Sequence, residues 1–393
     1  MMHLFINSLA ASAGGGLTYI RNVLPHLAAR TDLRVTVALS PGLKEEFSGF
    51  GQVDFVEVGV STARRFWYEQ SMLPDEIRRC AADVLLSSGN FALRKSPVPQ
   101  ILLSRNSIYT SADYYRDLRA RHEYRAWIET RLRAVLASRS IHWADLTVAP
   151  SEAFAAELRR WTGAPVLAIH HGFDPEAFTH DSRPLAAEVE KELISAEGAL
   201  KLLFVSHYNY YRNFETLIRS LPLLRDQLGG RPVKLLLTCR LLAGQNPGAY
   251  RPGSAAKLVK ELGVSDMVVE LGSIPYGQLH LLYGRADLYV TPAYTETFAH
   301  PLVEAMASGL PIVASDLPVH REICGDAAVY FSRFSEVELA QTIAQVARST
   351  ERSQAMAAQG AQRARQFSWK KHVEKILELS YSLINANSSR ISR

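Results

Sequence analysis

The apolar positions of the chain alternate between short, almost wholly apolar runs and longer stretches in which apolar residues recur every three or four positions. Short apolar runs predict parallel strands covered on both faces, and the longer period predicts helices. The predicted strands of the first half are 4–8, 35–39, 54–58, 84–87, 101–104, 146–149 and 166–169. Those of the second half are 202–206, 233–238, 268–271, 288–291, 312–315 and 329–331. This alternation predicts an α/β fold with doubly wound parallel sheets.

The pattern also predicts two domains. A chain of 393 residues exceeds what one hydrophobic core usually supports. Between about 174 and 199 the pattern gives way to proline, acidic and small residues, which indicates a linker. We therefore expect Rossmann-like domains at 1–180 and 181–365. A helical stretch at 366–386 could pack on the second domain or cross back to the first.

Composition and charge give only weak indications of the binding partners and the cellular compartment. The net charge of +5 favours anionic partners, but it is equally typical of a plain solubility charge. Cys80, Cys239 and Cys324 lack metal-ligand spacing, which fits a reducing, cytoplasmic setting. The first residues end in a signal-like A-x-A, but they lack a basic start and carry Asn7, so we expect a buried strand. No apolar run reaches the roughly 18 residues needed to span a bilayer, so membrane contact is expected to be peripheral.

The segment from Tyr289 to Tyr330 carries the most specific chemistry. A strand ends near Thr291, a loop carries Glu296, and a helix is expected from Pro301 with Glu304 in its first turn. The first amides of such a helix are unpaired donors that bind phosphate. Carboxylates at this place accept hydrogen bonds from sugar or ribose hydroxyls. Alternatively, Glu304 only complements the helix dipole.

This segment resembles the signature of glycosyltransferase family 4, the retaining transferases of GT-B fold, in which two Rossmann-like domains face a central cleft. Glu296 and Glu304 match the family's pair of glutamates eight positions apart. The resemblance implies that Glu296 lies beside the donor sugar as a catalytic residue and that Glu304 binds the nucleotide ribose. It also implies that the stretch from Phe298 to Leu302 faces the donor. The donor-binding residues expected there are Phe298, Ala299, His300 and Leu302, with Ala299 in place of the usual glycine.

A second part of the resemblance follows the first strand of the carboxy-terminal half. There the family has two cations that hold the donor diphosphate, and this chain has Ser206-His207 and then Arg212-Asn213. Arg212 keeps a cation with a fork suited to phosphate, so we expect it to act in both donor binding and catalysis. His207 is a weaker substitute because its charge depends on protonation. Without the resemblance, Arg212 would be a solvated arginine at a helix end. Asn213 is expected to cap the following helix.

A glycine turn, Gly14-Gly15-Gly16, follows the first strand. Such a turn lets the backbone approach a phosphate closely, so Gly15 and Gly16 are expected on the donor side. The turn is not a dinucleotide fingerprint, because GxGxxG would require glycine at Tyr19. A plain tight turn is the alternative.

The region from Arg105 to Arg139 combines eight arginines with aromatic residues that include Tyr114, Tyr115, Tyr124 and Trp127. It could meet anionic lipid headgroups or an anionic acceptor, although an ordinary solvated face is equally consistent with its acidic residues. Many members of the family have a histidine near the reaction centre on the preceding strand. Here that stretch offers Ser104, Arg105 and Asn106, so Arg105 and Asn106 are the acceptor-side candidates. No Asp-x-Asp occurs, which indicates a transferase without a bound metal.

Together, the resemblance implies a retaining hexosyltransferase that uses a UDP- or GDP-linked sugar as co-substrate and has no cofactor. The expected acceptor is a saccharide or lipid-linked saccharide in bacterial surface polysaccharide or lipopolysaccharide assembly, at the inner face of the membrane, with no nucleic-acid partner. The loops 298–302 and 273–276 are expected to select the donor sugar and base. The alternatives are a nucleotide-sugar epimerase on the same scaffold and a degenerate nucleotide-sugar-binding protein.

Overall fold

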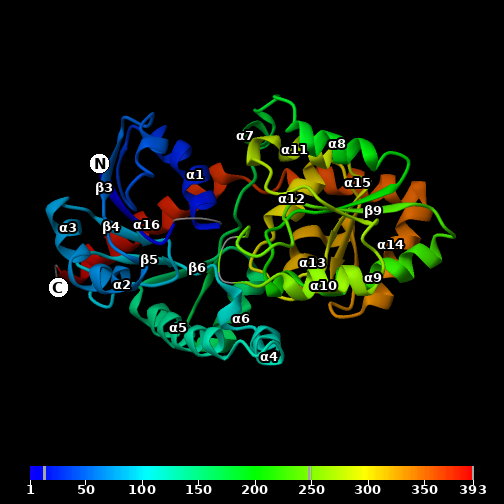
Figure 1. The fold of residues 1–393 in the computed structure, drawn as a ribbon. Helices are drawn as coiled ribbons and strands as arrows, with labels where there is room; N and C mark the ends of the chain where they lie inside the picture. The colour runs from blue at the N-terminus through cyan, green and yellow to red at the C-terminus, as the bar shows by residue number, and fades with distance from the viewer. Residues whose placement is uncertain (12–14, 247, 249, 392–393) are drawn as a thin grey trace. The chain divides into compact units, whose positions relative to one another are not determined.

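The computed structural model describes residues 1–11, 15–246, 248 and 250–391, without the side chains of 62, 63 and 388–391. Its contacts divide the chain into two compact units, both drawn in Figure 1. Unit 1 comprises Met1–Thr110, Glu123–Gly172 and Ser368–Arg393. Unit 2 comprises Ser111–His122 and Phe173–Phe367.

Unit 1 is built on a parallel sheet of seven described strands in the order β3-β2-β1-β4-β5-β6-β7. The strands are β1 (Met2–Asn7), β2 (Leu33–Leu39), β3 (Val53–Glu57), β4 (Val84–Ser87), β5 (Gln100–Leu103), β6 (Leu146–Ala149) and β7 (Leu167–Ala168). Its α-helices are α1 (Gly15–Ala28), α2 (Thr62–Ser71), α3 (Leu73–Arg79), α5 (Tyr124–Trp143), α6 (Glu152–Thr162) and α16 (Trp369–Ile391). The chain order reverses between β1 and β4, which is where open α/β sheets bind ligands.

The carboxy-terminal helix α16 completes the core of unit 1. Its buried residues Trp369, Val373, Ile376 and Leu377 join the cluster formed by β1, β2 and α1. A Cβ on Gly172 would lie 1.9 Å from the backbone nitrogen of Trp369. Only glycine therefore fits at this position, where the segment after β7 passes the start of α16. Of the two places that the sequence left open for this helix, the structure shows the packing on unit 1.

Unit 2 has a parallel sheet of six described strands in the order β10-β9-β8-β11-β12-β13. The strands are β8 (Leu200–Phe204), β9 (Val233–Leu237), β10 (Val268–Glu270), β11 (Leu288–Thr291), β12 (Ile312–Ser315) and β13 (Ala328–Phe331). Its longer helices are α4 (Ala112–Ala120), α8 (Ala187–Ser195), α9 (Phe214–Gln227), α10 (Gly253–Glu261), α12 (His300–Ala307), α14 (Glu336–Arg348) and α15 (Thr350–Ala364). Shorter helices are α7 (Pro175–Thr179), α11 (Leu279–Tyr283) and α13 (Pro318–Cys324).

Every strand predicted from the sequence overlaps an observed strand, and the doubly wound α/β fold is confirmed. The division of the chain differs from the expected one in two places. The chain passes from unit 1 to unit 2 between Gly172 and Phe173, and the segment Ser111–His122 belongs to unit 2. The expected linker also contains helices α7 and α8, because Val189 and Leu193 bury one face of α8 despite its acidic surroundings.

Candidate active site

The candidate site lies at the carboxyl ends of β8 and β11, the neighbouring strands at which the chain order of the second sheet reverses. The short 3-10 helix Tyr210–Arg212 follows β8, and the loop with Glu296 follows β11. Because parallel strands end at the same edge of a sheet, the two segments meet there. The structure therefore brings together Arg212 and Glu296, which lie 84 positions apart.

Arg212 and Glu296 form a mostly buried ion pair. The Arg212 Nη1 donates to Glu296 Oε2, and their side chains are 20% and 11% exposed. Burial opposes both charges, but each charge stabilises the other. As a result, the pKa of Glu296 is lowered and the pKa of Arg212 is raised. The alternative of a solvated Arg212 at a helix end is thus wrong: the guanidinium is charged and paired with Glu296, and its Nε has no acceptor among the described residues.

Ser206 and His207 stand on the loop after β8. The Ser206 amide donates to Thr238 Oγ1 at 2.9 Å, and its hydroxyl donates to the His207 carbonyl at 2.7 Å. Partial burial and the nearby Arg212 charge lower the pKa of His207. The imidazole is therefore neutral at pH 7, so His207 does not supply the second cation in this state.

The loop before α12 has an unusual backbone at Ala299, whose φ of 66° and ψ of 62° lie in the left-handed region. The side chains of Phe298 and Leu302 are each 1% exposed, and the Leu302 amide already donates to the Ala299 carbonyl at 2.9 Å. Leu302 therefore offers no free donor group to a ligand. His300 is partly exposed at the first position of α12, and its ring contacts Phe298 at a centroid distance of 4.9 Å.

Glu304 lies in the second turn of α12 and not in the first, because the helix starts one residue earlier than expected. Its side chain is buried, and the Tyr283 hydroxyl donates to Glu304 Oε2 at 2.9 Å. Burial raises the pKa of Glu304 to about 7, and the bond from Tyr283 opposes the rise. A group in this state is poised between its neutral and charged forms near neutral pH. The binding of a ribose by Glu304 stays a prediction.

Sequence reasoning missed His320, a buried histidine on α13 that interacts electrostatically with both Glu296 and Arg212. Its Nδ1 lies 2.9 Å from the Ser315 carbonyl, so this nitrogen carries the proton. Burial lowers the pKa of the imidazole, which is consistent with a neutral ring. The remaining nitrogen, Nε2, has no partner among the described residues.

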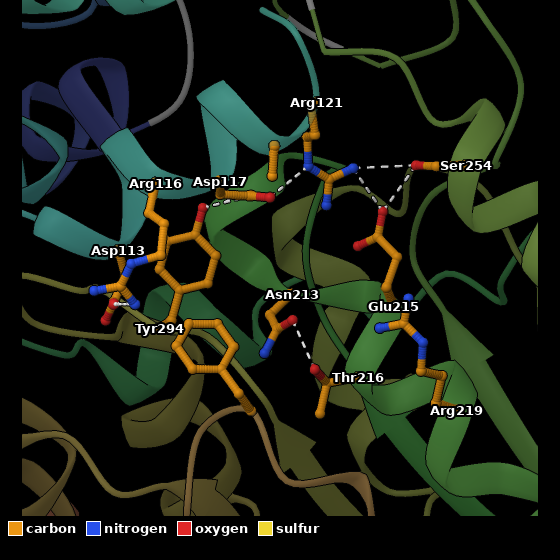
Figure 2. Close-up of a pocket in the computed structure, with 12 residues that line it drawn as sticks. Asp113, Arg116, Asp117, Arg121, Asn213, Glu215, Thr216, Arg219, Ser254 and Tyr294 are labelled. Carbon is orange, nitrogen blue, oxygen red and sulfur yellow. Dashed lines mark hydrogen bonds and ion pairs between the residues drawn. The ribbon is translucent and has the colours of Figure 1, made fainter.

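A cavity of about 470 Å³ lies next to this site in unit 2. Figure 2 shows the pairs that line it between α4 and α9. Arg121 Nη1 donates to Glu215 Oε1 at 2.8 Å, and the Tyr294 hydroxyl donates to Asp117 at 2.8 Å. Asn213 has left-handed φ and accepts from the Thr216 hydroxyl at 2.9 Å, so its side chain does not cap a backbone amide of α9 as expected. The bonds of Arg121 with Glu215 and of Tyr294 with Asp117 hold the segment Ser111–His122 on unit 2.

The acceptor-side and glycine-turn candidates lie in unit 1. Gly14 falls outside the described residues, and Gly15 begins α1. A Cβ on Gly16 would lie 3.1 Å from the Ala11 Cα, so a close backbone approach favours glycine there. Arg105 donates to the carbonyls of Gly15 and Ser88, whereas the Asn106 side chain accepts from the Ile108 amide at 3.3 Å and caps a 3-10 helix.

The described residues contain no group of three or more His, Cys, Asp or Glu side chains arranged to hold a metal ion. Among the same residues, none of the helices combines the length and the apolar character that crossing a bilayer requires.

Two family models match the chain. The model "Glycosyltransferase Family 4" matches residues 13–177, and the model "Glycosyl transferases group 1" matches residues 186–363. Together they cover most of both units. The second match includes Arg212, Glu296 and Glu304.

Individual relatives of this chain are also glycosyltransferases. A D-inositol 3-phosphate glycosyltransferase of Actinosynnema mirum is 28% identical over 63% of this chain and 60% of its own length. The O-antigen chain mannosyltransferase RfbU of Salmonella typhimurium is 36% identical over 20% of this chain and 22% of its own length. The first relatives match over 60% or less of their own lengths.

The structure of Anabaena HepE in complex with UDP-glucose is 18% identical, covers 98% of this chain and 100% of its own, and superposes with a TM-score of 0.71. At this identity the superposition shows a shared fold. The two parallel sheets of the structure are consistent with the two family-model matches. The chain belongs to the glycosyltransferases of family 4 and group 1, with the GT-B pair of Rossmann-like domains.

Proposed function

We propose that this protein is a retaining, metal-independent glycosyltransferase that moves a hexose from a UDP- or GDP-linked donor to a saccharide or lipid-linked saccharide. The observation that carries the proposal is the ion pair of Arg212 and Glu296 at the carboxyl ends of β8 and β11. This place is where an open parallel sheet binds a nucleotide. The similar structure of HepE was solved in complex with UDP-glucose, and this supports a nucleotide-sugar as the donor.

In the proposed reaction, Arg212 stabilises the charge that develops on the leaving diphosphate. The bond between the sugar C1 and the phosphate oxygen breaks, and the acceptor hydroxyl forms a new bond to C1 on the same face. Its proton passes to a donor phosphate oxygen. Glu296 holds Arg212 in place and orients the sugar. The buried, preformed pair requires little reorganisation when the donor binds.

The proposed setting is the cytoplasmic face of a bacterial membrane, in surface polysaccharide assembly. The similarity to an O-antigen chain mannosyltransferase supports this setting. The similarity to a D-inositol 3-phosphate glycosyltransferase also supports an anionic acceptor in one branch of the family. No cofactor besides the nucleotide-sugar is proposed.

Helix α5 supports a peripheral contact with an anionic membrane. Tyr124, Ile128, Leu132 and Val135 are spaced along one face of the helix, and each is more than half exposed. The opposite face is buried against unit 1 through small and apolar residues. The exposed arginines along the helix are Arg125, Arg131, Arg133 and Arg139. An apolar stripe flanked by arginines is typical of helices that lie in the headgroup region of a bilayer.

The proposed function is tested by NMR of the product that the protein forms from a panel of UDP- and GDP-sugars and saccharide acceptors. A retaining transferase gives a product with the anomeric configuration of the donor. An inverted anomeric centre contradicts the assignment. Turnover of the donor to an epimer or a free sugar without any acceptor would favour an epimerase instead.

A further inference from the structure

Arg105 forms no ion pair with a carboxylate among the described residues. Its Nη1 donates to the Gly15 carbonyl at 2.7 Å, and its Nη2 donates to the Ser88 carbonyl at 2.6 Å. Its Nε is buried and has no acceptor among the described residues. Burial lowers the pKa of Arg105 to about 10, so the guanidinium stays charged at pH 7. An unpaired charge in such a place costs stability, which suggests that a ligand completes the site.

Two neutral aromatic side chains, Tyr19 and His372, lie on the buried side of Arg105. The guanidinium lies 4.9 Å from the centre of the Tyr19 ring, and the Tyr19 hydroxyl lies 3.1 Å from His372 Nε2. Burial lowers the pKa of His372 to about 4, so this imidazole is neutral. Tyr19 and His372 are each 1% exposed. They hold the arginine in place without cancelling its charge.

Two other partly buried arginines of the described chain are paired with carboxylates. Arg121 bonds to Glu215 and Asp117, and Arg212 bonds to Glu296. Arg105 has no such carboxylate partner among the described residues. It follows β5, its partner Ser88 follows β4, and its partner Gly15 is the first residue of α1, beside the reversal point between β1 and β4. The geometry is therefore that of a ligand-binding edge with an uncompensated cation.

We propose that Arg105 binds an acidic group of the acceptor, a carboxylate or a phosphate, and that this contact makes the protein select anionic acceptors. The proposal rests on the proposed transferase function. The bonds to the Gly15 and Ser88 carbonyls use two of the five guanidinium N–H groups, so the fork retains donors for an anion. The donor diphosphate has a cation of its own in unit 2, Arg212, and Arg105 belongs to unit 1.

The first test measures transfer to pairs of acceptors that differ in one acidic group: a uronic acid glycoside against its carboxyl-reduced form, and a sugar phosphate against the free sugar. The two pairs separate a carboxylate from a phosphate. Wild type is expected to prefer the acidic member in kcat/KM by about tenfold to a hundredfold. Arg105→Gln is expected to lose that preference, because kcat/KM falls more for the acidic member than for the neutral one, and Arg105→Lys is expected to restore part of it.

Arg363 provides a matched control, because it also donates to two backbone carbonyls, those of Ile323 and Glu322. Arg363→Gln should leave the acceptor preference unchanged. An equal preference in wild type and Arg105→Gln, or an equal loss for acidic and neutral acceptors, overturns the proposal.

A second test does not depend on transfer. Calorimetry follows the binding of inorganic phosphate to the full chain with Arg212→Gln, which removes the cation of the donor site. Adding Arg105→Gln is expected to weaken this binding by about tenfold or more. If no acceptor is used but this loss is seen, the anion site stands and the transferase function fails. If phosphate binds equally with and without Arg105, the anion site is wrong.

Discussion

Arg212 donates to Glu296 within a largely buried pair that joins the loops after β8 and β11. In this state the cation expected to hold the diphosphate is already neutralised by a carboxylate. A phosphate that binds must share the guanidinium with Glu296, and the Nε–H, which has no acceptor among the described residues, is a donor not used by that pair. The pair thus fixes the position of Arg212 before the donor arrives.

Replacing Arg212 by Ala is expected to lower turnover by about a hundredfold or more, because it removes an electrostatic stabiliser of the leaving diphosphate. Initial rates at saturating donor measure the effect. Arg219→Ala is the matched control, since Arg219 is an exposed arginine on the adjacent helix α9. Turnover close to wild type in Arg212→Ala would remove this residue from the mechanism.

Ala299→Gly is expected to raise the free energy of unfolding by about 1 kcal/mol, because an L-residue in the left-handed region is strained and glycine is not. Chemical denaturation measures the change. Ala307→Gly, at an exposed position near the end of α12, is expected to do the opposite by a similar amount. Destabilisation by both substitutions would show that the Ala299 backbone is not strained.

The buried carboxyl of Glu304 predicts a pH dependence of stability. Its pKa in the folded protein is about 7, above the ordinary value of 4.5, so the folded state binds more protons between these limits. The free energy of unfolding contributed by this group therefore falls as the pH rises from about 4.5 to about 7, by about 3 kcal/mol in total.

Denaturation of wild type and Glu304→Gln at pH 4.5 and pH 8 isolates this effect, because glutamine does not titrate. The stability of the variant relative to wild type should increase with pH. Tyr283→Phe should steepen the dependence, since the Tyr283 hydroxyl stabilises the charged form. A stability difference that does not vary with pH would show that folding does not raise the pKa of Glu304.

Arg121→Ala is expected to lower the free energy of unfolding by about 3 kcal/mol, because it leaves the buried Glu215 carboxylate unpaired. Thermal and denaturant unfolding measure the change. Arg125→Ala, which breaks an exposed pair with Glu129, should cost less than about 1 kcal/mol. Similar small losses for both would mean that the Arg121 pair does not anchor the segment Ser111–His122.

The double substitution Ile128→Ser and Leu132→Ser is expected to reduce binding to vesicles that contain phosphatidylglycerol, because it removes the centre of the exposed stripe of α5. Sedimentation with such vesicles, and with phosphatidylcholine alone, measures it. Ile194→Ser changes an equally exposed apolar residue on α8 and serves as the control. If wild type does not sediment with the anionic vesicles, the membrane contact is refuted.

The sequence predicted the strands well because each is a short apolar run in a sheet covered on both faces. It failed at α8, whose acidic residues hide a single buried face made by Val189 and Leu193. It also missed the pairing of Arg121 with Glu215, because these residues lie 94 positions apart and no local pattern links them.

The sequence predicted which residues form the candidate site better than it predicted their pairing, burial and protonation. The spacing of Glu296 and Glu304 indicated both carboxylates, but only the fold shows that one is paired with Arg212 and the other is buried beside Tyr283. Such states depend on burial and on neighbours from other strands, so a motif does not reveal them.

The most direct test is a crystal structure of the protein with a bound nucleotide-sugar. We predict the diphosphate against Arg212 and the first turn of α12, the ribose hydroxyls at Glu304 and the sugar beside Glu296. A nucleotide bound elsewhere, or a Glu304 that stays bonded to Tyr283 with no ligand hydroxyl in reach, would contradict the proposed site.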